Sequence, residues 1–179
     1  MKLITLISML IAGTAIQSFF PVSAWLGFVT VPVLCSLVVY YALYRGGVIM
    51  LAAALLAGLF QDSMSLIPLG YSSFVFAVFA LVIERYRGLM VLQSSLTHMV
   101  ITAVTHVAFT IVLSVLLIQS GMIQWQPLWL FLKIPGALLL GIITGPLVIG
   151  LAQALEEKLG LIQGNSDQYG SQRSFYGIG

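Results

Sequence analysis

The sequence predicts an all-α membrane protein, a bundle of about six transmembrane helices. Hydrophobic residues make up 60% of the 179 residues and charged residues only 7%, whereas soluble domains carry roughly 25% charged residues. The mean hydropathy is +1.11. The apolar residues form six long runs, and nearly all charged residues fall between these runs. The bilayer, not water, is therefore the predicted solvent.

Six apolar runs mark the predicted spans. A straight span needs roughly 20 apolar residues, and the third and fourth runs are shorter than that. We therefore expect these two to extend into the segments around Gln61–Leu66 and Pro68, where a tight, partly buried turn would join them. The runs are Leu3–Phe20, Trp25–Tyr44, Gly47–Phe60, Tyr71–Ile83, Leu96–Ile118 and Leu128–Leu155.

Basic residues predict the orientation, because Lys and Arg are enriched in cytoplasmic loops. If the N-terminus is cytoplasmic, all basic residues but Lys133 fall on the cytoplasmic side. The outer connections at 21–24 and 121–126 carry no charge, and the third carries only Asp62. Both termini are thus expected in the cytoplasm. The basic residues on that side are Lys2, Arg45, Arg85, Arg87, Lys158 and Arg173.

The chain is predicted to contain one membrane domain and a tail. Residues 1–155 form the six-helix transmembrane domain, and residues 156–179 form a short, polar, disordered cytoplasmic tail, because this segment cannot bury enough apolar area to fold. One alternative concerns the first run. Lys2 precedes it and Val22-Ser23-Ala24 resembles a cleavage site, as in a signal peptide. The run is longer than a usual signal core, which favours a retained span, and cleavage stays open.

Asp62 is the most informative polar residue, because an ionisable group in a membrane helix is costly unless it is paired or solvated. Ala54, Gly58 and Asp62 recur every four residues, so they share one helix face. Small residues on such a face allow another helix to approach closely. We expect this face, with Pro68 and Gly70 in the following turn, to pack a helix or bind a partner. Alternatively, Asp62 is a solvated carboxylate that caps the turn.

Lys133 is the basic residue outside the cytoplasmic set, near the outer end of the sixth span. An intramembrane ion pair between Asp62 and Lys133 is one prediction. The alternative is that the lysine extends along the helix to reach lipid headgroups.

His98, Thr102 and His106 form a polar stripe on the fifth span. The two histidines are eight residues apart, about 12 Å along a helix, so they cannot bind one metal ion by themselves. No acidic residue or cysteine on this span completes a metal site. Hydrogen bonds between helices are the predicted role.

The sixth span carries Gly136, Gly141 and Gly145, with Pro135 and Pro146 interrupting its backbone hydrogen bonds. Gly141 and Gly145 have the spacing of a small-residue packing motif. We interpret them as sites of close helix contact in a kinked helix.

Nothing in the sequence indicates an enzyme. No G-x-S-x-G, P-loop or H-E-x-x-H pattern is present. Asp62 is the one Asp in the membrane region, and Glu84 falls on the opposite side of the bilayer. The net charge of +2 is too small to suggest nucleic acid as a partner. The prediction is a protein with no catalytic residue, metal or cofactor.

The second to fourth spans contain a recognisable set of residues. Gly58-Leu59-Phe60-Gln61-Asp62 ends one span and Pro68-Leu69-Gly70 precedes the next, with Pro32, Tyr40, Tyr41, Arg45 and Gly47 upstream. In these residues the chain resembles the family of the rod-shape-determining membrane protein MreD. That family shows Gly-Leu-x-x-Asp at the end of a short span and a Leu-Gly pair before the next. The polar tail is not expected of the family.

The resemblance implies a non-enzymatic scaffold in the bacterial inner membrane that supports cell shape and peptidoglycan synthesis in the cell-elongation machinery. The implied partners are an MreC-like bitopic membrane protein and, with it, MreB, RodA and the transpeptidase partner of RodA. The family is also thought similar in fold to the substrate-binding subunits of energy-coupled vitamin transporters. A small-molecule (vitamin) binding subunit is therefore the alternative function.

Overall fold

The computed structural model describes residues 2–19, 31–65, 67–89, 95–122 and 127–160. Within these residues the chain is entirely helical, with six α-helices and one short 3₁₀ helix. The elements are α1 (Lys2–Phe19), α2 (Val33–Tyr44), α3 (Gly47–Ser65), α4 (Tyr71–Tyr86), η2 (Arg87–Leu89), α5 (Ser95–Gln119) and α6 (Pro127–Lys158).

Each predicted apolar run corresponds to one helix, which confirms the all-helical prediction. α3 continues to Ser65, as expected from the shortness of its apolar run. The first part of the second run, residues 25–30, lies outside the described residues. α6 runs past the predicted domain boundary at residue 155 and continues through Glu156 to Lys158. Residues 161–179 of the predicted tail also lie outside the described part.

Three of these helices are long and apolar enough to cross a membrane: α3, α5 and the Lys133–Lys158 part of α6. Leu3–Phe19 and Val33–Tyr44 are shorter apolar helices. By length and composition, the helices are thus consistent with a membrane protein.

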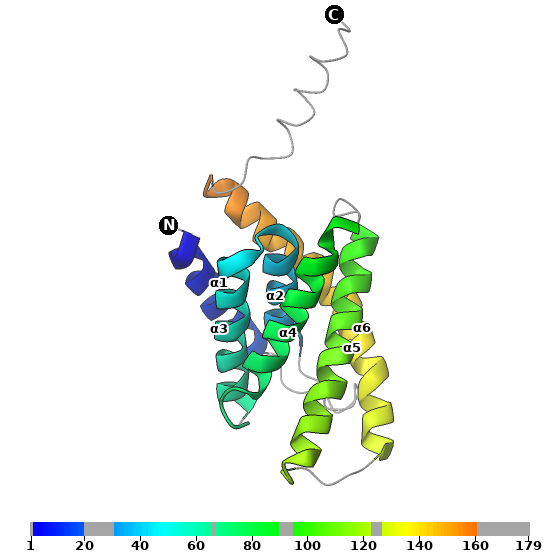
Figure 1. The fold of residues 1–179 in the computed structure, drawn as a ribbon. Coiled ribbons are helices and arrows are strands. Elements are labelled where there is room, and N and C mark those ends of the chain that lie inside the picture. Colours follow the sequence, from blue (N-terminus) through cyan, green and yellow to red (C-terminus); the bar gives the residue numbers. More distant parts are fainter. Residues whose placement is uncertain (1, 20–30, 66, 90–94, 123–126, 161–179) are drawn as a thin grey trace, which may run out of the picture.

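Consecutive helices run in opposite directions, and α2 lies in the centre of the bundle (Figure 1). α2 contacts each of the other five α-helices. Every α2 residue from Val33 to Leu43 is buried, so this helix forms the middle of the core. Around it, α3 packs closely on α4, and α5 packs closely on α6.

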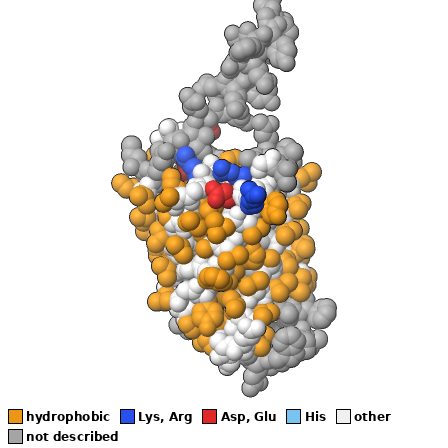
Figure 2. Space-filling view, viewed as in Figure 1, with side chains coloured by type: hydrophobic (Ala, Val, Ile, Leu, Met, Phe, Trp, Pro, Cys, Tyr) orange, Lys and Arg blue, Asp and Glu red, His pale blue; other side chains and the backbone are white. Residues whose placement is uncertain are grey.

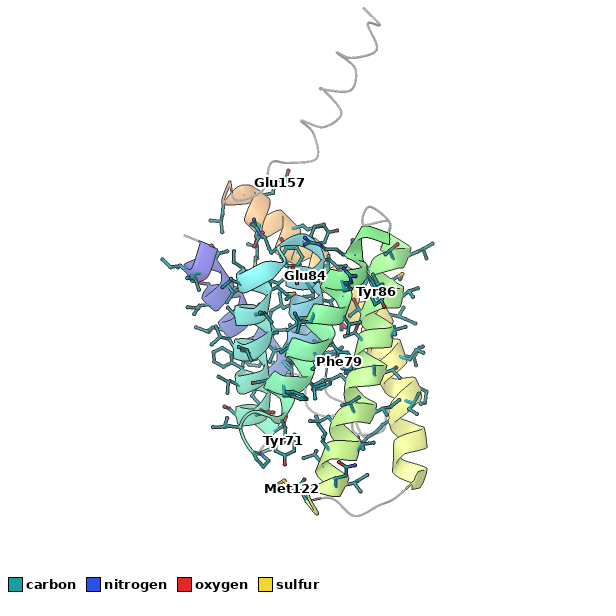
Figure 3. All side chains as sticks on the ribbon, in the orientation of Figure 1. Tyr71, Phe79, Glu84, Tyr86, Met122 and Glu157 are labelled. Atoms are coloured by element: carbon teal, nitrogen blue, oxygen red, sulfur yellow. The ribbon has the colours of Figure 1, made fainter. Side chains whose placement is uncertain are left out.

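The two ends of the bundle differ in charge. On the face seen in Figure 2, hydrophobic side chains cover the sides and charged side chains gather at one end. We call this the charged end; it contains Arg45, Glu84, Arg87 and Glu156. Figure 3 places Glu84 and Tyr86 there and Tyr71 and Met122 at the other end, here called the opposite end. The opposite end also holds the turn between α3 and α4.

Candidate functional site

The turn between α3 and α4 is organised by Asp62, whose side chain is fully buried. One carboxylate oxygen accepts a hydrogen bond from the N–H of Gly70 at 2.7 Å, and the other accepts one from the N–H of Ser72 at 3.0 Å. The Asp62 backbone carbonyl accepts a third from Ile67 at 3.3 Å. The first N–H groups of a helix have no partner within it. Asp62 therefore caps the N-terminus of α4.

The face formed by Ala54, Gly58 and Asp62 is covered by α4 of the same chain. A Cβ at Gly58 would overlap the backbone of Ser73, and the Ser73 hydroxyl donates to the carbonyl of Leu55 at 3.0 Å. Of the two expected roles of this face, packing of a helix is the one seen at Gly58 and Asp62, which contact α4 of the same chain. Ala54 is also fully buried.

Two further residues of the predicted site lie in the turn itself. Pro68 is exposed. Gly70 has φ +110°, a backbone conformation that residues with a side chain rarely adopt. Gly70 is therefore needed for the turn that brings the α4 amides to Asp62.

A second carboxylate, that of Glu84, caps the N-terminus of α3 at the charged end. Its Oε1 accepts a hydrogen bond from the N–H of Gly47, the first residue of α3, at 2.6 Å. Gly46 precedes it with φ +65°, and a Cβ there would overlap Glu84 and the guanidinium of Arg87. Each helix of the α3–α4 pair thus receives a carboxylate from the last turns of the other. Sequence reasoning did not identify the role of Glu84.

The strongest polar contact at the charged end involves Glu156, which is only 2% exposed. Its Oε2 pairs with Arg45, at 2.5 Å from Nη2 and 3.1 Å from Nε, and accepts a hydrogen bond from the Tyr40 hydroxyl at 2.8 Å. These contacts join the end of α6 to the end of α2. The expectation of a solvated tail from residue 156 is wrong here, because Arg45 offers an ionic partner inside the bundle.

The helical spacing of α6 carried a signal for Glu156. Gly145, Ile149, Ala152 and Glu156 are all buried and are separated by three or four residues, which places them on one helix face. Glu157 falls outside that face and is exposed. Hydropathy alone treats the two neighbouring glutamates alike, whereas the periodicity separates them.

The stripe on α5 is buried at His98, Thr102 and His106. A ring nitrogen of His98 lies 2.8 Å from the Tyr44 hydroxyl of α2, and Nδ1 of His106 lies 2.9 Å from the Ala137 carbonyl of α6. Thr102 instead donates to the His98 carbonyl of its own helix at 2.7 Å. The two histidines therefore join α5 to two different helices, and Thr102 does not.

Two glycines of α6, Gly141 and Gly145, face α5. A Cβ at Gly141 would lie 2.7 Å from the Cα of Ala103, and one at Gly145 would lie 2.6 Å from the Thr102 hydroxyl. Neither distance is compatible with ordinary van der Waals contact, so both positions need glycine for the observed packing. Pro135 and Pro146 lie within α6, and the helix continues through both.

Lys133 does not pair with Asp62 in the structure. Both carboxylate oxygens of Asp62 bind backbone amides of its own turn. Among the described residues the one ion pair is between Arg45 and Glu156. A carboxylate next to unsatisfied helix amides finds its partners within ten residues, so the predicted pair with a distant lysine is replaced by local capping.

Two glutamines that sequence reasoning missed join three helices. The Gln17 amide of α1 donates to Gln61 of α3 at 2.8 Å, and its oxygen lies 3.4 Å from the backbone N of Leu34 in α2. Gln61 also donates to the Ser65 hydroxyl at 3.1 Å. Both glutamines are buried. Each side-chain amide carries an NH₂ donor and an oxygen acceptor, and each glutamine uses both groups in these contacts.

The buried polar groups are almost fully used in these contacts. Within the described ranges, the one buried side-chain N or O atom without a hydrogen-bond partner is Oγ of Ser72. The same ranges contain no group of three His, Cys, Asp or Glu residues that could hold a metal ion. Several of the buried polar residues in this part of the chain, among them Gln17, His106 and Glu156, thus join one helix to another.

The chain matches no protein-family model, and no curated protein or solved structure is significantly similar to it.

Proposed function

We propose that this chain is a six-span integral membrane protein that acts as a non-enzymatic scaffold. The observation that carries the proposal is that the buried ionisable side chains and glutamines among the described residues bind groups on other helices or cap helix ends of the same chain. Asp62, Glu156 and His106 each bind a group of the same chain. A catalytic or ligand-binding site instead needs convergent polar groups directed at a cavity.

The proposed orientation places the charged end in the cytoplasm. Arg45, Arg85, Arg87 and Lys158 lie at this end, in agreement with the enrichment of basic residues in cytoplasmic loops. Both ends of the described chain, at the start of α1 and the end of α6, also lie on this side (Figure 1). An inner membrane of a bacterial cell is the proposed location.

The resemblance to the MreD family supplies the proposed process, cell elongation, and the proposed partner, an MreC-like bitopic membrane protein. The residues that carry the resemblance form one physical unit in this chain. Gly58 allows the close contact between α3 and α4, Asp62 caps α4, and Gly70 forms the turn between them. This unit supports a stable α3–α4 hairpin as one part of the proposed scaffold. MreB, RodA and its transpeptidase remain more distant proposed partners.

The proposal is tested by depletion and recovery in the native host. We expect depletion of the chain to turn rod-shaped cells round, and a tagged copy to recover a bitopic membrane protein with a large extracytoplasmic domain after mild cross-linking. The exposed variant Gly150→Leu should recover the same partner. Gly58→Leu, which breaks the α3–α4 contact, should not.

Normal cell shape on depletion would contradict the scaffold proposal. In that case native mass spectrometry of the purified chain tests the alternative, a vitamin-binding subunit of a transporter. A small organic molecule released in stoichiometric amount would support that alternative, and a ligand-free protein would reject it.

A further inference from the structure

Lys133 of α6 is a basic residue to which the contacts between helices give no role. Its side chain is half-buried, and within the described ranges it forms no hydrogen bond or ion pair. It precedes Ala137, Gly141 and Gly145 at intervals of four residues, so it continues the face of α6 that meets α5. An ionisable group on a membrane helix is costly unless it is paired or solvated. Lys133 therefore needs a partner that this part of the chain does not supply.

The hydrogen bond between α5 and α6 shows how deep Lys133 lies. The two helices are antiparallel (Figure 1), and His106 Nδ1 lies 2.9 Å from the Ala137 carbonyl. From that level α5 rises about 20 Å further to Gln119, whereas Lys133 lies only about 6 Å beyond Ala137. Val115, which is 39% exposed, is further out than Lys133. Lys133 thus lies about two turns short of the end of α5, at a level where the outer surface of the bundle is still apolar.

The side chain of Lys133 is too short to leave this depth. Side chains of a helix tilt toward its N-terminus, and the N-terminus of α6 is at the opposite end (Figure 1). Two turns span about 11 Å, which is longer than the four-carbon stem of a lysine. Headgroups at the level of Gln119 are therefore out of reach, and the ammonium has to be neutralised within the apolar layer.

This chain has no carboxylate for Lys133. Both carboxylate oxygens of Asp62 bind amides of its own turn. Asp167 lies outside the described residues, seven positions after Gly160. Seven residues extend at most about 25 Å, whereas α6 rises about 37 Å from Lys133 to Lys158. The other three of the five acidic residues lie at the charged end: Glu84, Glu156 and Glu157.

From these observations we propose that Lys133 is an interaction site for another membrane protein, which contributes the carboxylate of an Asp or Glu at the same depth of the bilayer. A second copy of this chain in the same orientation has its acidic residues at the same depths, so it cannot supply that carboxylate. Opposite charges attract far more strongly in an apolar layer than in water. The inference rests on the proposed membrane insertion, and it deepens the proposed scaffold function by giving the chemistry of one partner contact.

Zero-length cross-linking tests this contact in native membranes. Dicyclohexylcarbodiimide, which enters the apolar layer, activates a carboxylate so that an adjacent amine forms an amide with it and a urea is released. A tagged copy of the full chain is expressed in the native host, treated in isolated membranes and digested, and peptides joined at residue 133 are sequenced by mass spectrometry. Lys133→Gln lacks the amine. Lys158→Gln, which alters an exposed lysine at the charged end, is the matched control.

We expect the unaltered chain and Lys158→Gln to carry an amide between Lys133 and an Asp or Glu of a different membrane protein, and Lys133→Gln to lack it. The absence of any amide at residue 133 would overturn the proposal. An amide that joins Lys133 to an acidic residue of this same sequence would also overturn it.

Binding of the protein identified in this way measures the contribution of the charge. Its recovery in mild detergent should fall about tenfold with Lys133→Gln, equivalent to about 1.4 kcal/mol, and should stay close to that of the unaltered chain with Lys133→Arg, which keeps the charge. Equal recovery with both variants would overturn the proposal. Loss of a bound anionic phospholipid from Lys133→Gln in native mass spectrometry, with the partner protein retained, would assign the lysine to a lipid phosphate instead.

Failure of this contact and failure of the scaffold proposal give different results. Round cells on depletion, together with no amide at residue 133, would reject the contact and keep the scaffold. Normal cells on depletion, together with an amide to a different membrane protein, would reject the scaffold and support the contact.

Discussion

The α3–α4 and α5–α6 pairs are both antiparallel and both rely on glycine for close contact, yet they are fixed in different ways. In α3–α4, Gly58 meets Ser73 and a carboxylate closes each end, Asp62 at one and Glu84 at the other. In α5–α6, Gly141 and Gly145 meet α5 and His106 adds one hydrogen bond to the Ala137 carbonyl.

The two pairs differ in which helices supply the polar contacts at their ends. The capping contacts of α3–α4 lie within the pair, between residues fewer than forty apart in sequence, although α3 also bonds to α1 through Gln61. The charged end of α5–α6 is fixed to α2 through Glu156 and His98. Both pairs pack on α2, but the helix ends of α3–α4 are capped from within the pair, whereas the charged end of α5–α6 is bound to α2.

The largest loss of stability is expected when the glycine contact between α3 and α4 is disrupted. Gly58→Leu places a side chain where the Ser73 backbone lies, so the helices must separate. Overpacking typically costs about 1–3 kcal/mol and occasionally more. Because the overlap here is with backbone, we expect a loss at or above the upper end of that range, and the variant should lose most folded protein in a thermal unfolding assay in detergent. Gly150→Leu is the matched control, because nothing lies within 4 Å of that site. Equal stability of the two variants would show that the α3–α4 contact is not close.

The second-largest loss of stability is expected when the ion pair that joins α6 to α2 is broken. Glu156→Ala leaves Arg45 without its carboxylate, and breaking a buried pair costs 3–5 kcal/mol. Because Arg45 is 15% exposed, we expect a value at the lower end, about 3 kcal/mol, in the free energy of unfolding. Glu157→Ala, at the exposed neighbour, should change stability by less than about 0.5 kcal/mol. If both variants behave alike, α6 does not depend on this pair.

A smaller loss is expected for the cap of α4. Asp62→Ala removes two hydrogen bonds from a buried carboxylate and should destabilise the fold by about 2 kcal/mol. The same assay on Ser63→Ala, an exposed residue one position further on, supplies the reference. Hydrogen exchange of the Gly70 and Ser72 amides should rise in Asp62→Ala and stay low in Ser63→Ala. Slow exchange in both would argue against the cap.

The smallest effect concerns the link from α5 to α2. Tyr44→Phe removes the hydroxyl that contacts His98 and should cost about 1 kcal/mol. Tyr86→Phe, which alters a 53% exposed tyrosine, is the control and should be close to neutral. A neutral Tyr44→Phe would indicate that this hydrogen bond contributes little to holding α5 on α2.

Hydropathy predicted the helices well because each apolar run is long compared with the uncertainty at its ends. It also placed Ala54, Gly58 and Asp62 on one face, since spacing along one helix is a local property. Helical spacing could not predict which helix packs against that face. It offered Lys133 as one possible partner for Asp62, whereas the amides of Gly70 and Ser72 lie within ten residues and need an acceptor.

Contacts between distant helices were the hardest to predict. Glu156 and Arg45 are 111 residues apart, and neither position alone indicates the other. Gln17 and Gln61 are separated by 44 residues and look like ordinary polar residues at the ends of apolar runs. Such pairs depend on how the helices are arranged around α2, which hydropathy and helical spacing do not specify.

The exchange of carboxylates between α3 and α4 has a consequence for biosynthesis. The last turn of α3 contains Asp62, whose partners belong to the start of α4. α3 begins at Gly47, whose acceptor Glu84 belongs to the end of α4. Neither helix is complete until the other has been made. We therefore expect the insertion machinery to release the two into the membrane together, as a hairpin, and a ribosome stalled before Glu84 emerges to leave α3 unreleased.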